Sequence, residues 1–225
     1  MYRVVRESFE KKKTRTKKII ALLKREYPQA KCSLNFHNPL QLLVATRLSA
    51  QCTDARVNKV TQGLFRRYKT AQDFANASQR ELEREVQSTG FFRAKANSIR
   101  MAARKMVEIF GGEVPRTMEE MLTLDGIGRK SANVILGNAY GMPSGIAVDT
   151  HVLRIMKRLG LSYAKHPEKM ELDLLKLVPK KDWILFPHLV ISHGRKICQA
   201  RKPKCGECRL NRVCPSSLVQ QFPPA

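Results

Sequence analysis

The sequence predicts an all-α protein, and two observations support that prediction. Apolar residues recur at spacings of three and four along most of the 225 residues, as they do on the buried face of a helix. Strict alternation of apolar and polar residues over five or more positions is absent, so nothing in the pattern favours a β-strand. Capping residues and glycines then divide the pattern into separate helices.

The first expected helix has apolar residues at 19–23 and ends before Pro28. Asn38 and Pro39 have the form of an N-cap followed by the first helical residue. They open a second helix whose inward positions are Leu40, Leu43, Val44 and Leu48. A third helix has its apolar face at Val57, Val60, Leu64, Phe65 and Tyr68.

Two capping boxes, Ser78 with Glu81 and Thr117 with Glu120, are each expected to start a short helix. A longer helix is expected between them, from about residue 92 to 110, and a pair of glycines ends it. The second capping box leads the chain into a glycine hairpin.

Two changes along the chain suggest two helical domains. A breaker cluster at 141–145 interrupts the helical pattern, and the C-terminal tail is rich in cysteine and lysine but poor in large aliphatic residues. We expect a helical bundle at 32–143, with a helix-hairpin-helix at about 117–139. We expect a second, discontinuous domain of 1–31 with 144–225. It would contain the tail, which needs a cross-link because it cannot build a hydrophobic core alone.

The net charge of +23 is the most unusual bulk property and favours a polyanionic partner. Solvated lysine faces and an anionic membrane surface are the alternatives. The basic run at 11–18 leads into what looks like ordinary core, however, so nucleic acid is preferred. The chain has no apolar run of membrane-spanning length and does not open on a secretory signal. We therefore expect an intracellular protein with reduced thiols.

Four cysteines near the C-terminus have the spacing C-x6-C-x2-C-x5-C and are Cys198, Cys205, Cys208 and Cys214. Thiolates this close in a reducing compartment indicate a metal site. The uneven spacing favours a [4Fe–4S] cluster, while zinc remains the alternative, since structural zinc usually shows two short C-x-x-C knuckles. Basic residues between the cysteines would offset the cluster's charge, contact phosphate, or do both. Cys32 and Cys52 are expected in the core.

The hairpin Leu124-Asp125-Gly126-Ile127-Gly128 lies between two expected helices, which is typical of a helix-hairpin-helix that binds phosphate through backbone amides. Lys130 then opens the second helix, where the helix N-terminus disfavours a protonated amine. A free amine can attack a carbonyl-like carbon and form a Schiff base. Asp149 could supply a carboxylate for this chemistry, or could simply cap the helix that follows it.

Residues of about 30–214 resemble the endonuclease III branch of the helix-hairpin-helix DNA glycosylases. Its motifs are matched at 48–54, 90–96, 126–134, 147–151 and 193–195, together with the four cysteines in order. The resemblance implies a bifunctional DNA glycosylase and abasic-site lyase of base excision repair that removes oxidised pyrimidines. It also implies a DNA-binding cleft between two domains, a [4Fe–4S] cluster and, as we expect, a monomer.

Lys130 matches the family's nucleophile, which displaces the damaged base at C1′ and leaves an imine whose β-elimination nicks the strand. Asp149 matches its essential carboxylate, and the two are expected to face each other across the DNA groove. Gln51 matches the residue that fills the space left by the base, and Phe91 matches an apolar wedge. A local cap for Gln51 and a core position for Phe91 are the alternatives. The full set of predicted DNA-binding residues is Gln51, Phe91, Gly126, Gly128, Arg129 and His151.

Three positions depart from the family pattern: Asp125 replaces a proline, Arg47 an aliphatic residue and Phe92 a tyrosine. Lys130 separates this chain from an adenine-excising relative that lacks the lysine and from a mismatch-thymine relative with tyrosine there. A metal-stapled DNA-binding module without catalysis would explain the charge and the cysteines, but it leaves Lys130 and Asp149 without a purpose. The expected partner is double-stranded DNA containing a damaged base or an abasic site, with no membrane involved.

Overall fold

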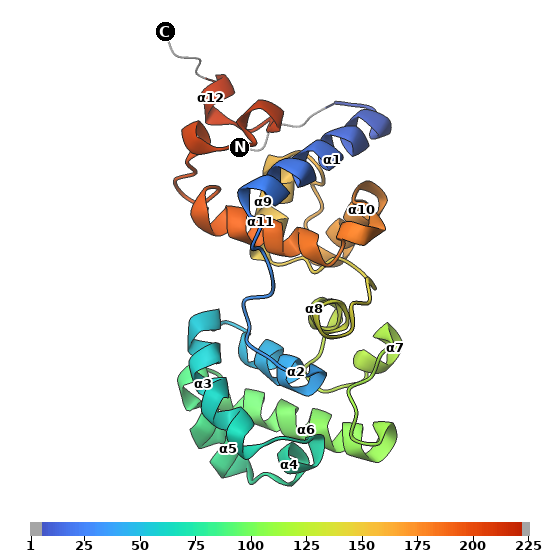
Figure 1. Cartoon of the computed structure of the whole chain (residues 1–225), viewed down its shortest axis with the longest axis vertical. Coiled ribbons are helices and arrows are strands. Elements are labelled where there is room, and N and C mark those ends of the chain that lie inside the picture. Colours follow the sequence, from blue (N-terminus) through green and yellow to red (C-terminus); the bar gives the residue numbers. More distant parts are fainter. Residues whose placement is uncertain (1–5, 222–225) are drawn as a thin grey trace. The chain divides into compact units, whose positions relative to one another are not determined.

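The computed structural model describes residues 6–221, and every regular element in that range is a helix (Figure 1). The all-α prediction is confirmed. The chain divides into two compact units, one of Cys32–Ser144 and one of Met1–Lys31 with Gly145–Ala225. The break after Ser144 lies one residue beyond the boundary expected from the breaker cluster. Among the described helices, none has an apolar stretch that could cross a lipid bilayer.

We call Cys32–Ser144 the bundle unit. Its α-helices are α2 (Pro39–Leu48), α3 (Asp54–Arg67), α4 (Ala71–Asn76), α5 (Gln79–Val86), α6 (Phe92–Phe110), α7 (Met118–Met121) and α8 (Arg129–Tyr140), and a 3-10 turn, η1 (Gln87–Thr89), precedes α6. α4 and α5 pack on α6, and α2 packs on α8. The long helix expected at about 92–110 is α6, and it ends at Gly111 in the left-handed conformation.

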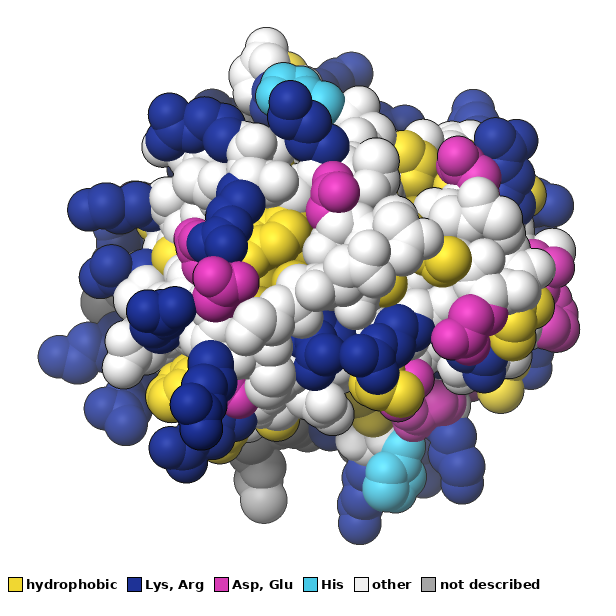
Figure 2. All heavy atoms as spheres, turned by 90° about the horizontal axis from the view of Figure 1, so that it is seen from below, with side chains coloured by type: hydrophobic (Ala, Val, Ile, Leu, Met, Phe, Trp, Pro, Cys, Tyr) yellow, Lys and Arg dark blue, Asp and Glu magenta, His cyan; other side chains and the backbone are white. Residues whose placement is uncertain are grey.

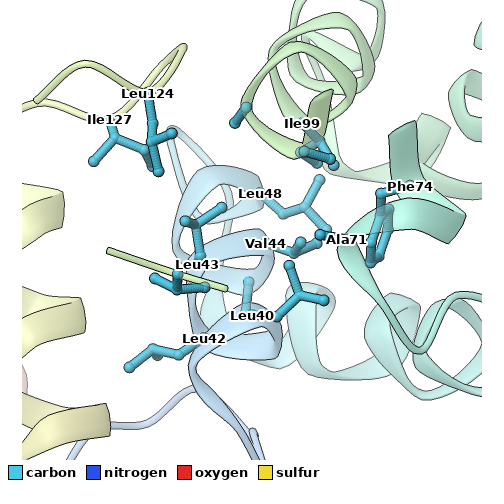
Figure 3. Close-up of a cluster of buried hydrophobic side chains, with 14 of the residues drawn as sticks. Leu40, Leu42, Leu43, Val44, Leu48, Ala71, Phe74, Ile99, Leu124 and Ile127 are labelled. Carbon is cyan, nitrogen blue, oxygen red and sulfur yellow. The ribbon is translucent and has the colours of Figure 1, made fainter. Parts of the chain in front are cut away.

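The core of the bundle unit is built around α2. Leu42, Leu43 and Leu48 are each at most 1% exposed, and each such side chain contributes about 1.5–3 kcal/mol by burial. Figure 3 shows Leu124 and Ile127 of the hairpin on one side of α2, with Ala71 and Phe74 of α4 on the other. The helix therefore joins the hairpin to the rest of the bundle through apolar contacts.

We call the other unit the cysteine unit. Its helices are α1 (Phe9–Glu26), α9 (Thr150–Arg158), α10 (Pro167–Leu177), α11 (Leu185–Lys196) and α12 (Leu218–Gln221), with 3-10 turns η2 (Lys180–Asp182), η3 (Cys205–Glu207) and η4 (Asn211–Val213). α11 packs against both α9 and α1. Ile19, Ile155 and Phe186 are almost fully buried in its core, so α1 is held by residues far away in the sequence.

The predicted capping box at Ser78 and Glu81 is wrong. Ser78 is the N-cap of α5 but makes no side-chain capping bond, and the Glu81 carboxylate instead pairs with Arg67 at 3.2 Å. A complete capping box occurs at Thr70 and Asp73 and starts α4, a short helix that the periodicity did not predict. The ion pair thus draws Glu81 away from the helix end.

The capping box expected at Thr117 and Glu120 forms in part. The Glu120 backbone amide donates to the Thr117 hydroxyl oxygen at 3.2 Å, which is the first half of the motif. In the second half of the motif the carboxylate accepts from the N-cap backbone amide. Here the Glu120 carboxylate accepts from the Thr117 hydroxyl instead, at 2.9 Å. The helix that follows, α7, is a single turn.

Candidate functional site

The hairpin between α7 and α8 is a tight turn that requires glycine at Gly126. The Ile127 amide donates to the Leu124 carbonyl at 3.1 Å, and Gly126 has φ +74°. A Cβ on Gly126 would lie 2.9 Å from Cδ of Arg47 and from Oγ of Ser98, closer than Cβ atoms pack. Both the backbone angle and the close approach therefore exclude a side chain at this position.

Lys130 lies in the first turn of α8, where its side chain is exposed. Gly128 is the N-cap of this helix, and its carbonyl accepts from the Ala132 amide at 3.0 Å. Ala132 and Ile135 are fully buried and fix the helix on the bundle core. The amine is thus accessible while the helix that carries it is rigidly packed. Arg129, the first residue of α8, is half-buried.

Gln51 and Phe91 follow the ends of two helical elements in the bundle unit and share an unusual backbone conformation. Within residues 6–221 they are the non-glycine residues with positive φ, at +52° and +47°. Phe91 is 67% exposed, so the core alternative for it is wrong. The N-cap of α3 is Thr53, which accepts from the Arg56 amide, so Gln51 does not cap that helix. Positive φ at non-glycine residues often marks a functional site.

Arg47, a departure from the family pattern, lies beneath the hairpin. Its Nε donates to the Ser98 hydroxyl, and its aliphatic chain occupies the space next to Gly126. Burial lowers the pKa of Arg47. Of the other two departures, Asp125 is exposed in the hairpin, and Phe92 carries the Arg93 guanidinium 5.5 Å from its ring centre. Arg47 therefore joins α2, α6 and the hairpin.

Asp149 belongs to the cysteine unit, where it is the N-cap of α9. Its Oδ1 accepts from the Val152 amide at 2.8 Å, so the alternative role as a helix cap is present in the structure. The bond satisfies an orphan donor of the helix and holds the carboxyl group at the N-terminal end of α9. The side chain is half-buried. Its catalytic role is not decided by this bond and stays a prediction.

No sequence pattern indicated His188, which lies in α11 within electrostatic reach of Asp149. Burial lowers the pKa of His188, and the Asp149 carboxylate opposes that shift. A single histidine on a largely apolar helix has no motif that distinguishes it from a core residue. The packing of α11 on α9 is what brings the two side chains into one environment.

His151 lies in the first turn of α9, next to Gly194 of α11. The His151 Nδ1 is 3.2 Å from Nη2 of Arg154. A Cβ on Gly194 would come within 2.7 Å of that ring nitrogen and 2.9 Å of Ile155 Cδ1. Glycine in the His193-Gly194-Arg195 motif therefore lets α11 pass directly over the start of α9.

The four C-terminal cysteines line one cavity in the cysteine unit, with a volume of about 420 Å³. Leu159 and Leu210 contribute apolar walls. Burial raises the pKa of Cys208 and of Cys214 to about 11, so without a cation beside them both would be neutral thiols at neutral pH. Cys32 and Cys52, expected in the core, are half-buried and pack against the core of the bundle unit.

Two arginines of α9 hold the chain around the cysteine cavity. Arg158 Nη1 lies 3.2 Å from Cys198 Sγ and 2.7 Å from the Gln199 carbonyl, and its Nη2 donates to the Ala200 carbonyl at 2.8 Å. Arg154 Nη2 donates to the Cys198 carbonyl at 3.0 Å. The helix capped by Asp149 is thus bonded to the segment that begins the cysteine motif.

A buried polar chain reaches the same cavity from the other side. Tyr27 Oη is 3.0 Å from Nδ1 of His193, whose Nε2 is 3.6 Å from Cys208 Sγ. Desolvation lowers the pKa of His193 to about 4, so the ring is neutral at physiological pH. A neutral imidazole has one donor and one acceptor, which allows Tyr27 to donate and Nε2–H to point at the sulfur.

The predicted site residues are divided between the units. Gln51, Phe91, the hairpin glycines, Arg129 and Lys130 lie in the bundle unit, whereas Asp149, His151 and the four cysteines lie in the cysteine unit. The expected facing of Lys130 and Asp149 stays a prediction. On the face drawn in Figure 2, Lys and Arg side chains are widely spread, with fewer Asp and Glu side chains between them. The surplus charge is therefore distributed over this face.

An all-α fold with a glycine hairpin and an exposed lysine at the following helix N-terminus defines a helix-hairpin-helix protein. The family model of the HhH-GPD superfamily base excision DNA repair proteins matches residues 44–180, and the chain belongs to that superfamily. It is similar to Endonuclease III of Synechocystis sp., with 55% identity over 92% of this chain and 94% of the relative, and to that of Bacillus subtilis, with 45% identity over 84% and 86%.

Two solved structures have the same fold over almost the whole chain. A non-covalent endonuclease III–DNA complex matches with a TM-score of 0.87 and 40% identity, covering 93% of this chain and 98% of that one. A trapped endonuclease III–DNA covalent intermediate, the estranged-adenine complex, matches with a TM-score of 0.85 and 40% identity, covering 92% and 99%.

The geometry of Gly126 predicts that Gly126→Ala lowers the free energy of unfolding by about 2 kcal/mol or more. The added Cβ would disfavour the left-handed backbone conformation and would overlap with the Arg47 side chain. The control is Gly128→Ala, where nothing lies within 4 Å, with an expected loss of about 1 kcal/mol or less. Adding Arg47→Ala to Gly126→Ala should restore part of the loss. Urea unfolding measures all four proteins, and equal losses for the two glycines would contradict the geometry.

Proposed function

We propose that this protein is a bifunctional DNA glycosylase and abasic-site lyase that excises oxidised pyrimidines in base excision repair. The observation that supports it most directly is the exposed amine of Lys130, in the first turn of the helix that Gly128 caps. Similarity to a trapped endonuclease III–DNA covalent intermediate supports the same chemistry. We further propose that it acts as a monomer inside the cell on double-stranded DNA containing a damaged base or an abasic site.

The hairpin would bind the DNA backbone. Amides near Gly126 and Gly128, with the positive end of the α8 dipole, suit a phosphate, and Arg129 adds a cation at the same helix end. The damaged base leaves the stack, since its sugar cannot otherwise be reached. Gln51 would then occupy the vacated space and Phe91 would wedge beside it, which offsets part of the unstacking cost.

Lys130 would attack C1′ of the extruded nucleotide as a neutral amine. The Nζ–C1′ bond forms as the bond from C1′ to the base breaks, and the base leaves with the bonding electrons and takes up a proton. The Asp149 carboxylate would stabilise positive charge that develops on the sugar and accept the proton that Nζ loses. His151 would lie near the bound nucleotide from the first turn of the same helix.

The nitrogen lone pair then opens the sugar ring: the C1′–O4′ bond breaks, O4′ takes up a proton from water, and a protonated imine forms between Nζ and C1′. Loss of a proton from C2′ then expels the 3′ phosphate, so the strand is nicked by β-elimination. Water finally hydrolyses the imine, which releases the sugar aldehyde and returns Lys130 as an amine. The proton taken from C2′ is carried away by a base or by water.

The cysteine cavity would hold a [4Fe–4S] cluster through Cys198, Cys205, Cys208 and Cys214. A cavity of about 420 Å³ lined by four sulfur donors is far larger than one metal ion needs, which favours a cluster over zinc. When bound, the cluster would cross-link a tail that has little core of its own. Its anionic charge would be met by Arg158, next to Cys198 Sγ, and by the Nε2 of His193.

The covalent step predicts that borohydride traps the protein on duplex DNA containing an abasic site. Reduction of the imine should give an adduct visible on a denaturing gel, and Lys130→Ala should abolish it. Lys169→Ala, which removes another exposed lysine, should trap as well as the unaltered protein. Absence of an adduct with the unaltered protein would instead support a DNA-binding module without catalysis.

The two roles of Asp149 can be separated by substitution. Asn and Asp are equally good N-caps, so Asp149→Asn should change stability by less than about 0.5 kcal/mol, while Asp149→Ala should lose about 1 kcal/mol. Both variants should slow base excision by about 10² to 10⁴, the range of a lost proton-transfer group. Single-turnover excision and urea unfolding measure the two effects. Full activity of Asp149→Asn would reduce this residue to a cap.

The cysteine site predicts iron and acid-labile sulfide in equal molar amounts in the purified protein. Cys208→Ser should lose most of the iron and unfold at lower urea, because the tail loses its cross-link. Cys52→Ser, at a half-buried position of the bundle unit, should keep the full metal content. One equivalent of zinc without sulfide would establish the other metal.

A further inference from the structure

Lys95 is a buried lysine that the proposed reaction does not use. It lies near the N-terminus of α6, and it is only 1% exposed. Its Nζ donates to the Leu48 carbonyl at 2.8 Å and to the Thr89 carbonyl at 2.7 Å. Desolvation lowers the pKa of this amine. Lysine is among the residues least often fully buried, so these two bonds offset a substantial desolvation cost.

The two carbonyls belong to the ends of different elements. Leu48 is the last residue of α2, and Thr89 is the last residue of η1, where carbonyl groups lack partners within the helix. Gln51 follows Leu48 by three residues, and Phe91 follows Thr89 by two. One amine therefore binds the two segments that carry the exposed side chains assigned to the space of the extruded base.

Both segments also carry the strained backbone of the bundle unit. Gln51 and Phe91 have positive φ, a conformation that residues with a Cβ keep only where the surrounding structure imposes it. Lys95 contacts the Phe91 segment twice, because its backbone amide donates to the Phe91 carbonyl at 3.0 Å. On the other segment, the Cys52 amide donates to the Ser49 carbonyl at 3.1 Å, and this hydrogen bond closes the turn after Leu48.

We propose that Lys95 is a positioning residue for base extrusion, whose amine holds the Gln51 and Phe91 segments at a fixed separation so that both side chains enter the duplex together. The proposal rests on the proposed function. Lys95 touches neither DNA nor the reacting atoms and acts through the Leu48 and Thr89 carbonyls. Without it, two buried carbonyls lose their partner and the segments move independently.

The first test compares Lys95→Met and Lys95→Gln with Leu82→Ala, a core substitution in α5 that lowers stability and lies outside both segments in the sequence. Excision of thymine glycol from a duplex should fall by about 100-fold in the Lys95 variants, because a small misplacement of the Gln51 and Phe91 side chains has an effect of this size. Borohydride trapping on an abasic duplex should fall by less than about fivefold. No base has to be extruded from this DNA, so the placement of Gln51 and Phe91 affects its trapping least. Leu82→Ala should change both rates equally.

The second test begins with Lys95 intact, so its first comparison does not depend on the folding of Lys95 variants. If the two segments act together, the excision loss of Gln51→Ala combined with Phe91→Ala should be smaller than the product of the single losses by about twofold or more. When Lys95→Gln is also present, the two segments should act independently, so the combined excision loss should equal the product of the single losses. Fluorescence of 2-aminopurine opposite the lesion follows the opened pair directly, and its rise should be lost in Lys95→Gln.

Multiplying losses in the protein with intact Lys95, or equal slowing of excision and trapping in its variants, would overturn the positioning role. Failure of the proposed function would look different, because the unaltered protein would then form no borohydride adduct with abasic DNA at all. A normal adduct with the unaltered protein, together with a selective loss of excision in Lys95→Gln, is the expected result.

Discussion

Each helix leaves backbone groups unpaired at its ends, and the way this protein satisfies them places its functional side chains. Asp149 is held because its carboxylate caps α9 through the Val152 amide. Lys130 is accessible because Gly128 caps α8 without a side chain that would cover the helix end. Lys95 takes up carbonyls at the ends of α2 and η1. A fold of short helices thus offers many rigid ends, and the proposed catalytic and positioning residues lie at these ends.

In the bundle unit, the position of the hairpin depends on apolar packing more than on polar contacts. Leu124 and Ile127 are at most 5% exposed and pack beside α2, so a change at the centre of the core would displace the turn proposed to bind DNA. Arg47 adds a polar contact to Ser98 beneath Gly126. The turn is therefore fixed before any ligand arrives, as a phosphate site made of backbone amides requires.

In the cysteine unit, α9 connects the proposed carboxylate to the proposed cluster. Its N-terminus is capped by Asp149, and its Arg154 and Arg158 bind carbonyls of the segment that begins at Cys198. A cluster that cross-links the tail would therefore also stiffen the helix on which Asp149 depends. Such a cofactor can contribute to catalysis by fixing positions, without taking part in the bond changes at the sugar.

The sequence by itself determined the all-α class, the extent of α6 and the set of candidate residues, because helical periodicity, glycine pairs and the cysteine spacing are local patterns. Local pattern also suggested a capping box of Ser78 with Glu81, which is absent because Arg67, on a neighbouring helix, pairs with the Glu81 carboxylate. Only the tertiary structure showed the burial of Lys95, the closeness of His188 to Asp149 and the packing beneath Gly126. The partners of Lys95 are backbone carbonyls, which every residue possesses, so no residue pattern can reveal them until the chain has folded.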